Sequence, residues 1–294
     1  MHAIPASFLA MPRWWHDDEG REWLSELPSL IDRQCATWQL TPDGEIRHGS
    51  NALVVPVRRG DEPAMLRLAP PGDDVAAEAR ALRHWAGAPV VELLDLDPPQ
   101  RAMLLERLDA NRSLASESVL AAMSVLGRLV SELATPAPVT VPSTREIAAT
   151  SLSTFPLDWE SQGRPTSRSV LDSTLIAAAE LSSAPDEDAS VNGDVHPDQV
   201  LAGPRRRWTV VDPVLLRGDI EYDGARALWS LLPRMRGDDD IRLAFHTFVD
   251  AAGVPEERAR AWVLVRSMSY LLWGLDHGLT VDPPKCRRLL EVFT

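Results

Sequence analysis

The chain has 294 residues, enough for one large hydrophobic core or two smaller ones, and its 45% hydrophobic and 25% charged residues are ordinary for a globular protein. Its net charge of −13 argues against a nucleic-acid partner, because phosphate contacts need clustered Lys and Arg, and it suits either a cationic ligand or simple solubility. No apolar run approaches the roughly 18 residues of a membrane span, and Cys35 and Cys286 form no disulfide framework or metal motif, so we expect a cytoplasmic protein without a membrane partner.

The first third of the chain predicts a helix followed by pairs of short strands. Apolar residues recur at helical spacing over residues 18–40, and Pro28 is expected to interrupt that helix. Four runs rich in Val and Leu follow, and we expect each to be a strand. A turn at Gly60 separates the first two, a helix capped by Asp73 or Asp74 follows the second, and a turn at DPPQ separates the last two. The strands are expected at residues 51–58, 63–69, 90–96 and 102–108, and the helix at 73–85.

The remainder of the chain is expected to be mainly helical. Its predicted helices cover residues 116–133, 145–153, 168–181, 219–233, 239–252, 255–274 and 284–292. A linker-like break at 136–142 and one short strand pair interrupt them. This order predicts an α+β fold in two lobes, in which residues 1–108 form the N-terminal lobe with a helical extension and residues 109–294 form the C-terminal lobe.

The segment VNGDVHPDQVLAGPRRRWTVVDP, residues 191–213, concentrates polar side chains that could carry chemistry. On an extended strand Asp194, His196 and Asp198 would point to one side, as the ligands of a metal site do. A glycine and a proline within the segment interrupt a regular strand, however, and no further His cluster completes such a site. The Gly, Asp, Asn and Pro content also fits an ordinary solvated turn.

A third interpretation uses a longer spacing in the same segment. Gln199 lies five positions after Asp194. The apolar run WTVV, residues 208–211, then leads directly into Asp212, which lies 18 positions after Asp194. Phosphoryl transfer from ATP needs a carboxylate that orients the acceptor hydroxyl and receives its proton, together with oxygen ligands for Mg²⁺. An amide just after the first carboxylate and an aspartate at the end of the next strand can supply such ligands.

The pattern G-D-x-H-x-x-[NQ], followed by an apolar run ending in D-P, resembles the signature of aminoglycoside phosphotransferases and related small-molecule kinases. The segment LLRGDIEYDGARALW also matches this family, and RHGSNALVVPV, AMLRLAP and MLLERL occur in the order of its N-terminal lobe. The resemblance covers nearly the whole chain and fits the streptomycin 6-kinase branch best. It implies the fold of protein kinases, with a small antiparallel-sheet lobe and a larger, mainly helical lobe.

The resemblance implies a role for each polar residue of the segment. Asp194 corresponds to the catalytic base, and Gln199 and Asp212 correspond to the Mg²⁺ ligands, although many relatives carry Asn in place of the glutamine. His196 is expected to be structural. Asp223 resembles a buried aspartate that holds the catalytic loop by accepting backbone N–H bonds.

The resemblance also implies an ATP site in the N-terminal lobe. Arg67 occupies the position of the phosphate-gripping lysine, and Glu78 is positioned to pair with it. A planar guanidinium is not a compact ammonium, so a catalytically impaired relative is one reading of this change. The other reading is that Arg67 works in place of the lysine. Lys285 is the only lysine of the chain, and a genome that has lost almost all lysines is expected to use arginine at such positions. The remaining expected nucleotide contacts are Gly49, Ser50, Asn51, Glu106 and Leu108.

The acceptor is expected beside Asp194 in the helical lobe, where carboxylates would recognise a polycationic aminoglycoside. The candidate contacts are Asp198, Glu221, Asp276, Trp229 and Trp273, with Asp158 and Glu160 as further acids. Solvated surface explains these acids at least as well, and core packing explains the tryptophans.

The resemblance therefore implies an ATP- and Mg²⁺-dependent O-phosphotransferase acting on a hydroxyl of an aminoglycoside or related amino-sugar. A metabolic sugar or glucosamine-type kinase is the alternative among enzymes. A nucleotide-binding pseudokinase that serves as an interaction module is the alternative from another class. We expect a monomer or a weak dimer.

Overall fold

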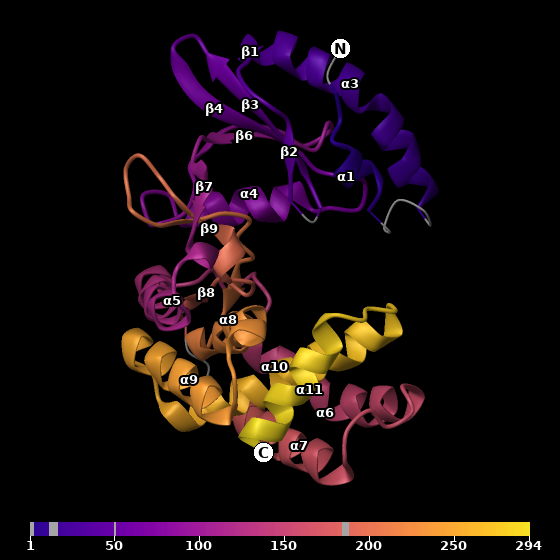
Figure 1. Cartoon of the computed structure of the whole chain (residues 1–294), viewed down its shortest axis with the longest axis vertical. Helices are drawn as coiled ribbons and strands as arrows, with labels where there is room; N and C mark the ends of the chain where they lie inside the picture. The colour runs from indigo at the N-terminus through magenta and orange to yellow at the C-terminus, as the bar shows by residue number, and fades with distance from the viewer. Residues whose placement is uncertain (1–2, 12–16, 50, 184–187) are drawn as a thin grey trace. The chain divides into compact units, whose positions relative to one another are not determined.

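The structure of the protein is a computed structural model that describes residues 3–11, 17–49, 51–183 and 188–294 (Figure 1). The chain divides into two compact units, of which the first holds residues 1–109 and 203–205 and the second holds residues 110–202 and 206–294. The sequence did not indicate that residues 203–205 join the first unit. An antiparallel sheet dominates the first unit and helices dominate the second, which is the predicted α+β class.

The first unit is built on a sheet with the strand order β1-β3-β4-β6-β5, in which β2 also pairs with β3. Its strands are β1 (Leu40–Pro42), β2 (Arg47–His48), β3 (Leu53–Arg59), β4 (Glu62–Leu68), β5 (Leu93–Asp97) and β6 (Ala102–Glu106). β3 and β4 form the predicted hairpin, in which Leu53 pairs with Leu68 and Arg59 with Glu62. Gly60 makes the turn with a φ of +63°, a left-handed conformation that glycine adopts without steric cost.

Among the described residues, the helices α1 (Ala6–Leu9), α3 (Asp18–Trp38) and α4 (Val75–His84) accompany this sheet. α3 continues through Pro28, so the predicted interruption is wrong. Trp23 and Ile31, on either side of the proline, are buried in one hydrophobic core with β3 and β4, and this packing outweighs the hydrogen bond that proline cannot donate. Asp74 caps α4 by accepting a hydrogen bond of 2.8 Å from the backbone N–H of Ala77, which decides between the two predicted caps.

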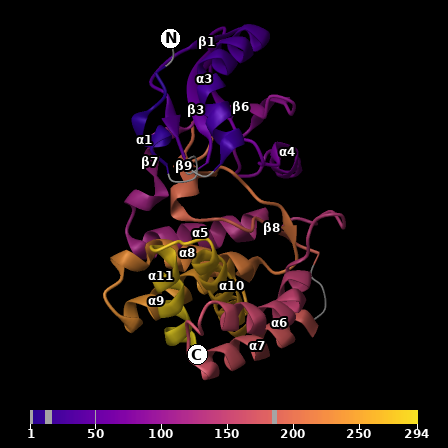
Figure 2. The same ribbon diagram turned by 90° about the vertical axis from the view of Figure 1, so that its right-hand side faces the viewer.

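The second unit is mainly helical, and several of its helices pack around α10 (Figure 2). The helices of this unit are α5 (Val119–Leu133), α6 (Thr144–Ser161), α7 (Arg168–Ser183), α8 (Gly224–Leu231), α9 (Asp238–Ala252), α10 (Glu256–Asp276) and α11 (Asp282–Phe293). α10 packs against α6, α7, α8 and α11, while α5 packs against α9. Trp262 and Met268 of α10 are fully buried, so this helix forms the centre of the second core.

Several of these helices differ from their predicted extents, and α8 covers Gly224–Leu231 rather than residues 219–233. α5 is capped by Ser118, whereas the sequence suggested a start at Ser116. α6 runs past Pro156 and is longer than predicted. Phe155 and Trp159 are buried on either side of that proline, so tertiary packing again maintains the helix.

Two small sheets include strands from the polar segment 191–213 and its neighbours. Their strands are β7 (Asp109–Ser113), β8 (Ser190–Val191), β9 (Val200–Ala202), β10 (Thr209–Val210) and β11 (Leu216–Arg217). The first sheet has the order β10-β9-β7, and the second pairs β11 with β8. β7 was not predicted because its residues DANRS are exposed and lack apolar alternation. Among the described residues no helix is both long and apolar enough to cross a membrane.

Candidate active site

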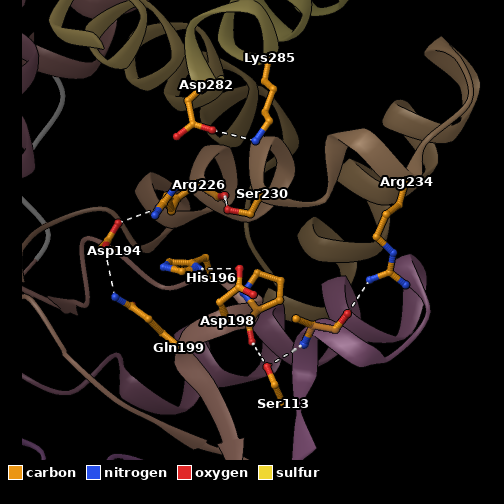
Figure 3. Close-up of polar contacts among 12 residues, drawn as sticks. Ser113, Asp194, His196, Asp198, Gln199, Arg226, Ser230, Arg234, Asp282 and Lys285 are labelled. Carbon is orange, nitrogen blue, oxygen red and sulfur yellow. Dashed lines mark hydrogen bonds and ion pairs between the residues drawn. The ribbon is translucent and has the colours of Figure 1, made fainter. Parts of the chain in front are cut away.

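The loop between β8 and β9 presents the carboxylate of Asp194, with a side chain that is 35% exposed. Oδ1 accepts a hydrogen bond of 2.8 Å from Nε of Arg226 on α8, and Oδ2 accepts one of 3.2 Å from Nε2 of Gln199 (Figure 3). Gly193 precedes it with a φ of +81°, and a Cβ there would lie 2.9 Å from Leu216, so the turn requires glycine. The loop thus offers a carboxylate that is accessible and held at both oxygens.

Two residues of the second unit hold the backbone of this loop through hydrogen bonds. Asp223 is fully buried and accepts hydrogen bonds from the N–H groups of Gly193, at 3.3 Å, and Val195, at 3.4 Å, as the resemblance implied. Nη2 of Arg266 donates to the carbonyl oxygen of Gly193 at 3.0 Å, and its guanidinium lies over the ring of Tyr222. Burial raises the pKa of Asp223 to about 7, while Arg266 and the two N–H groups act to lower it.

His196 and Asp198 interact with each other within the loop. Nδ1 of the largely buried His196 lies 3.5 Å from the carboxylate of Asp198, whose side chain is exposed. The contact with His196 lowers the pKa of Asp198, although partial burial opposes that shift. Within the described parts of the chain, no three His, Cys, Asp or Glu side chains gather into a cation-binding cluster.

Gln199 and Asp212 lie at the same end of the β9–β10 pair. The carbonyl oxygen of Gln199 accepts a hydrogen bond of 2.8 Å from the N–H of Val211, the neighbour of Asp212. Asp212 has a φ of +49°, which is rare for a residue other than glycine and turns the chain away from the strand direction. The sequence predicted this placement from the apolar run that ends at the aspartate.

The side chain of Gln199 provides an observation that favours a bound cation. Its Oε1 is buried and has no hydrogen-bond partner among the described residues, while its Nε2 is committed to Asp194. A buried amide oxygen without a partner is costly, and Mg²⁺ is bound by such oxygens together with one or two carboxylates and phosphates. Gln199 and Asp212 therefore fit the ligand set of this ion.

The nucleotide candidates lie in the first unit. Nη2 of Arg67 on β4 lies 3.1 Å from Oε2 of Glu78 on α4, and both side chains are almost completely buried. Asn51 donates a side-chain hydrogen bond to the carboxylate of Asp73. The carbonyl oxygen of Gly49 is 2.8 Å from Nδ1 of the preceding histidine. Ser50 lies outside the described residues.

Glu106 ends β6, and Leu108, which follows two residues later, is buried. Arg205 donates two hydrogen bonds to the carboxylate of Glu106, from Nε at 2.9 Å and from Nη2 at 2.6 Å, and its Nη1 lies 2.7 Å from Glu92. This pairing was not predicted, because an arginine in a basic turn is ordinarily solvated. Backbone groups near Glu106 rather than its carboxylate are thus the ones left to contact a ligand.

Two predicted acceptor contacts are wrong because both residues lie in the interior. Trp229 is fully buried and stacks on Tyr270 with ring centroids 4.9 Å apart. Glu221 is also buried. The face of α8 that carries Trp229 packs against α10, so this ring is unavailable to a sugar.

Three other predicted residues line one groove between α6 and α10. The groove has a volume of about 510 Å³, and Asp158, Asp276 and the half-exposed Trp273 contribute to it. Glu146, which the sequence did not single out, adds a third carboxylate. Glu160 does not line the groove and pairs instead with Arg164, which lies just after the end of α6. The second unit thus has an acidic groove with an aromatic wall.

Comparisons with known proteins identify the family. The family described as aminoglycoside/hydroxyurea antibiotic resistance kinase matches residues 37–278. The streptomycin 6-kinase of Streptomyces griseus is 37% identical, over 91% of this chain and 89% of that protein. The hydroxyurea phosphotransferase of Kitasatospora aureofaciens is 34% identical, over 99% of this chain and 85% of that protein.

Solved structures show the same fold. An aminoglycoside phosphotransferase in a ternary complex with ADP and hygromycin B matches with a TM-score of 0.65 and 16% identity, over 90% of this chain and 98% of that one. A choline kinase from Streptococcus pneumoniae matches with a TM-score of 0.61 and 12% identity, over 91% of this chain and 99% of that one. The fold is therefore kinase-like, and the chain belongs to the aminoglycoside/hydroxyurea antibiotic resistance kinase family.

Proposed function

We propose that the protein is an ATP- and Mg²⁺-dependent O-phosphotransferase whose acceptor is a hydroxyl of an aminoglycoside, with streptomycin as the first candidate and related amino-sugars next. The carboxylate of Asp194, held at both oxygens by Arg226 and Gln199, is the observation that carries this proposal. A relative named streptomycin 6-kinase at 37% identity supports the choice of acceptor.

In the proposed reaction Asp194 accepts a hydrogen bond from the acceptor hydroxyl. The hydroxyl oxygen attacks the γ-phosphorus, the bond from that phosphorus to the β,γ-bridging oxygen breaks, and ADP leaves. The hydroxyl proton passes to Asp194 and from there to solvent. An ionised carboxylate has about four lone-pair sites, so Asp194 can receive this proton while it keeps both present hydrogen bonds.

Gln199, through its buried Oε1, and Asp212, through its carboxylate, would hold Mg²⁺. When bound, this ion neutralises charge on the phosphates. In the first unit we assign phosphate contact to Arg67, with Glu78 orienting its guanidinium. The backbone from Gly49 to Asn51, and the chain near Glu106 and Leu108, are the remaining proposed nucleotide contacts. Residues 1–108 would thus bind the nucleotide, and residues 109–294 would carry the catalytic loop.

We assign the acceptor to the groove between α6 and α10. Three carboxylates, from Glu146, Asp158 and Asp276, suit a ligand with several ammonium or guanidinium groups. Trp273 supplies an exposed face on which a sugar ring can stack. Asp198 is also exposed and stays a candidate beside the loop.

A panel of acceptors tests this proposal. Purified protein with Mg²⁺ and ATP is incubated with streptomycin, other aminoglycosides, glucosamine and hydroxyurea, and products are read by mass spectrometry and ³¹P NMR. Phosphorylation of an aminoglycoside in preference to the rest is expected. Exclusive phosphorylation of glucosamine or hydroxyurea would contradict the assigned acceptor. No phosphorylated product, together with ATP binding, would instead indicate a pseudokinase.

We also propose a cytoplasmic enzyme, because ATP is supplied there, that acts as a monomer or weak dimer. Sedimentation velocity across a concentration series measures the oligomeric state. A stable higher oligomer would contradict this expectation.

A further inference from the structure

Arg226 is the only charged residue of α8, and the sequence predicted no role for it. Its Nε donates the 2.8 Å hydrogen bond to Oδ1 of Asp194, and its side chain is only 18% exposed (Figure 3). We propose that Arg226 is a positioning residue that fixes the Asp194 carboxylate for the acceptor hydroxyl. This inference rests on the proposed role of Asp194 as the proton acceptor.

Two aromatic rings hold the guanidinium of Arg226 in place. Its Cζ lies 5.4 Å from the ring centroid of Trp229 and 5.9 Å from that of Tyr270. These rings stack on one another with an interplanar angle of 21°, and Trp229 is fully buried. A cation over a fixed aromatic surface is attracted to it and loses little further freedom when it binds a carboxylate. Arg226 is therefore a preorganised donor.

The second oxygen of Asp194 is held independently. Oδ2 accepts its bond from Gln199, which belongs to a short 3-10 helix at the end of the loop, whereas Arg226 belongs to α8. Donors from two elements, one on each oxygen, prevent the carboxylate from rotating about its Cβ–Cγ bond. The lone pairs left over then point in fixed directions, as a reacting hydroxyl requires.

The same aromatic pair connects Arg226 with the acceptor groove. Tyr270 lies one turn of α10 before Trp273, and their ring centroids are 5.3 Å apart. Burial raises the pKa of Tyr270, and Arg226 and Asp194 both lie close enough to act on this phenol in opposite directions. The groove wall, the aromatic pair, Arg226 and Asp194 thus form one continuous series of contacts.

Loss of a positioning residue lowers kcat in a protein that still folds, whereas loss of a merely structural residue lowers stability. The carbonyl oxygen of Arg226 accepts a hydrogen bond of 2.8 Å from Ser230 Oγ, and this bond survives any change of the arginine side chain. We therefore expect Arg226→Ala to fold. Its kcat should fall by about 10²-fold, because small misplacements of a reacting group cost that much. KM for the acceptor and the Kd of ATP should change by less than about threefold, since the ground-state contacts stay.

The experiment compares Arg226→Ala, Arg226→Gln and Arg226→Lys in steady-state kinetics with the acceptor found in the panel. Lysine restores the charge but not the planar donor, so partial recovery of kcat is expected, and glutamine should recover less. Added guanidinium ion should raise the kcat of Arg226→Ala in a saturable way. Arg234→Ala is the matched control, because this nearby arginine bonds to the carbonyl oxygens of Ala115 and Glu117 instead.

Asp194→Asn in the same assay separates this inference from the proposed function. If Asp194→Asn is inactive and Arg226→Ala keeps the wild-type kcat, the inference about Arg226 is overturned and the proposed function stands. If Asp194→Asn is fully active, both are overturned. A crystal structure of Arg226→Ala gives a readout that needs no activity: a displaced or disordered Asp194 carboxylate supports the inference, and an unchanged one contradicts it.

Discussion

Nη2 of Arg67 lies 3.1 Å from Oε2 of Glu78 in the first unit, with side chains that are 8% and 14% exposed. β4 carries the arginine and α4 the glutamate, so the pair joins the sheet to a helix. The family resemblance places a lysine at residue 67. We propose that this site is adapted to arginine, because its guanidinium meets a largely buried carboxylate at hydrogen-bond distance.

Removing the carboxylate should destabilise the first unit. Glu78→Ala leaves the largely buried Arg67 without this partner, and breaking such a pair costs about 3 kcal/mol in the free energy of unfolding. Urea denaturation followed by circular dichroism measures the loss. Glu26→Ala, at an exposed position of α3, is the control and should change stability little. Equal stability of both variants would show that the pair contributes nothing.

Arg67→Lys should weaken ATP binding although it restores the residue of the resemblance. The lysine keeps the charge but lacks the planar donors that match Glu78, and we expect the Kd of ATP to rise about tenfold. Isothermal titration calorimetry with a non-hydrolysable ATP analogue provides the measurement. Tighter binding by the lysine variant would mean that Arg67 is a tolerated replacement rather than an adapted one.

Trp229 and Trp273 should behave oppositely when truncated. Trp229 is fully buried, so Trp229→Ala should cost about 3–5 kcal/mol in the free energy of unfolding. Trp273 is 48% exposed in the groove, so Trp273→Ala should raise KM for the acceptor and leave thermal stability nearly unchanged. Differential scanning fluorimetry and steady-state kinetics on the two variants decide the matter. A stable Trp229→Ala with a raised KM would reverse this assignment.

Neutralising the groove should weaken acceptor binding selectively. Asp158→Asn and Asp276→Asn each remove a carboxylate from the groove, and together we expect them to raise KM for a polycationic acceptor about tenfold. KM for ATP should stay the same. Glu160→Gln is the control on the same helix, since Glu160 pairs with Arg164 outside the groove. An unchanged acceptor KM in the double variant would place the acceptor elsewhere.

Asp223 should make stability depend on pH in a defined direction. Its pKa is raised from 3.8 to about 7, so the folded state holds the proton more tightly than the unfolded chain between these values. Asp223 therefore lowers the free energy of unfolding as pH rises through that window, with no further change above about 7.

Asp223→Asn removes this contribution. Urea denaturation of wild type and variant at about pH 5 and about pH 8 isolates it, because other carboxylates contribute equally to both proteins. The wild type should lose more stability than Asp223→Asn over that interval. Asp239→Asn, at an exposed position, should follow the wild type. Parallel pH profiles for wild type and Asp223→Asn would show that Asp223 is ionised throughout.

The pattern of apolar residues predicted those elements that depend on residues close together in the sequence. The β3–β4 hairpin follows from two Val- and Leu-rich runs around Gly60, and the placement of Asp212 follows from the apolar run before it. The same local rules failed at Pro28 and Pro156. There, burial of neighbouring side chains maintains the helix, and burial depends on residues far away in the sequence.

The candidate site was predicted only in part for the same reason. Asp194, Gln199 and Asp212 share one segment and its spacing, so sequence reasoning could relate them. Arg226 lies on a later helix and reaches Asp194 only through the fold. For Trp229 the sequence left both an acceptor contact and core packing open, because the sequence of a helix does not show which face an aromatic residue buries.

Phosphotransfer to streptomycin by wild type and Asp194→Asn tests the central claim most directly. Both proteins are incubated with Mg²⁺ and ATP, and the formation of monophosphorylated streptomycin is followed by mass spectrometry, with melting temperatures measured in parallel. The wild type should form the product, and Asp194→Asn, with an unchanged melting temperature, should form it about 10²–10⁴-fold more slowly. A folded Asp194→Asn that phosphorylates streptomycin at the wild-type rate would contradict the assignment of Asp194 as the residue that receives the acceptor proton.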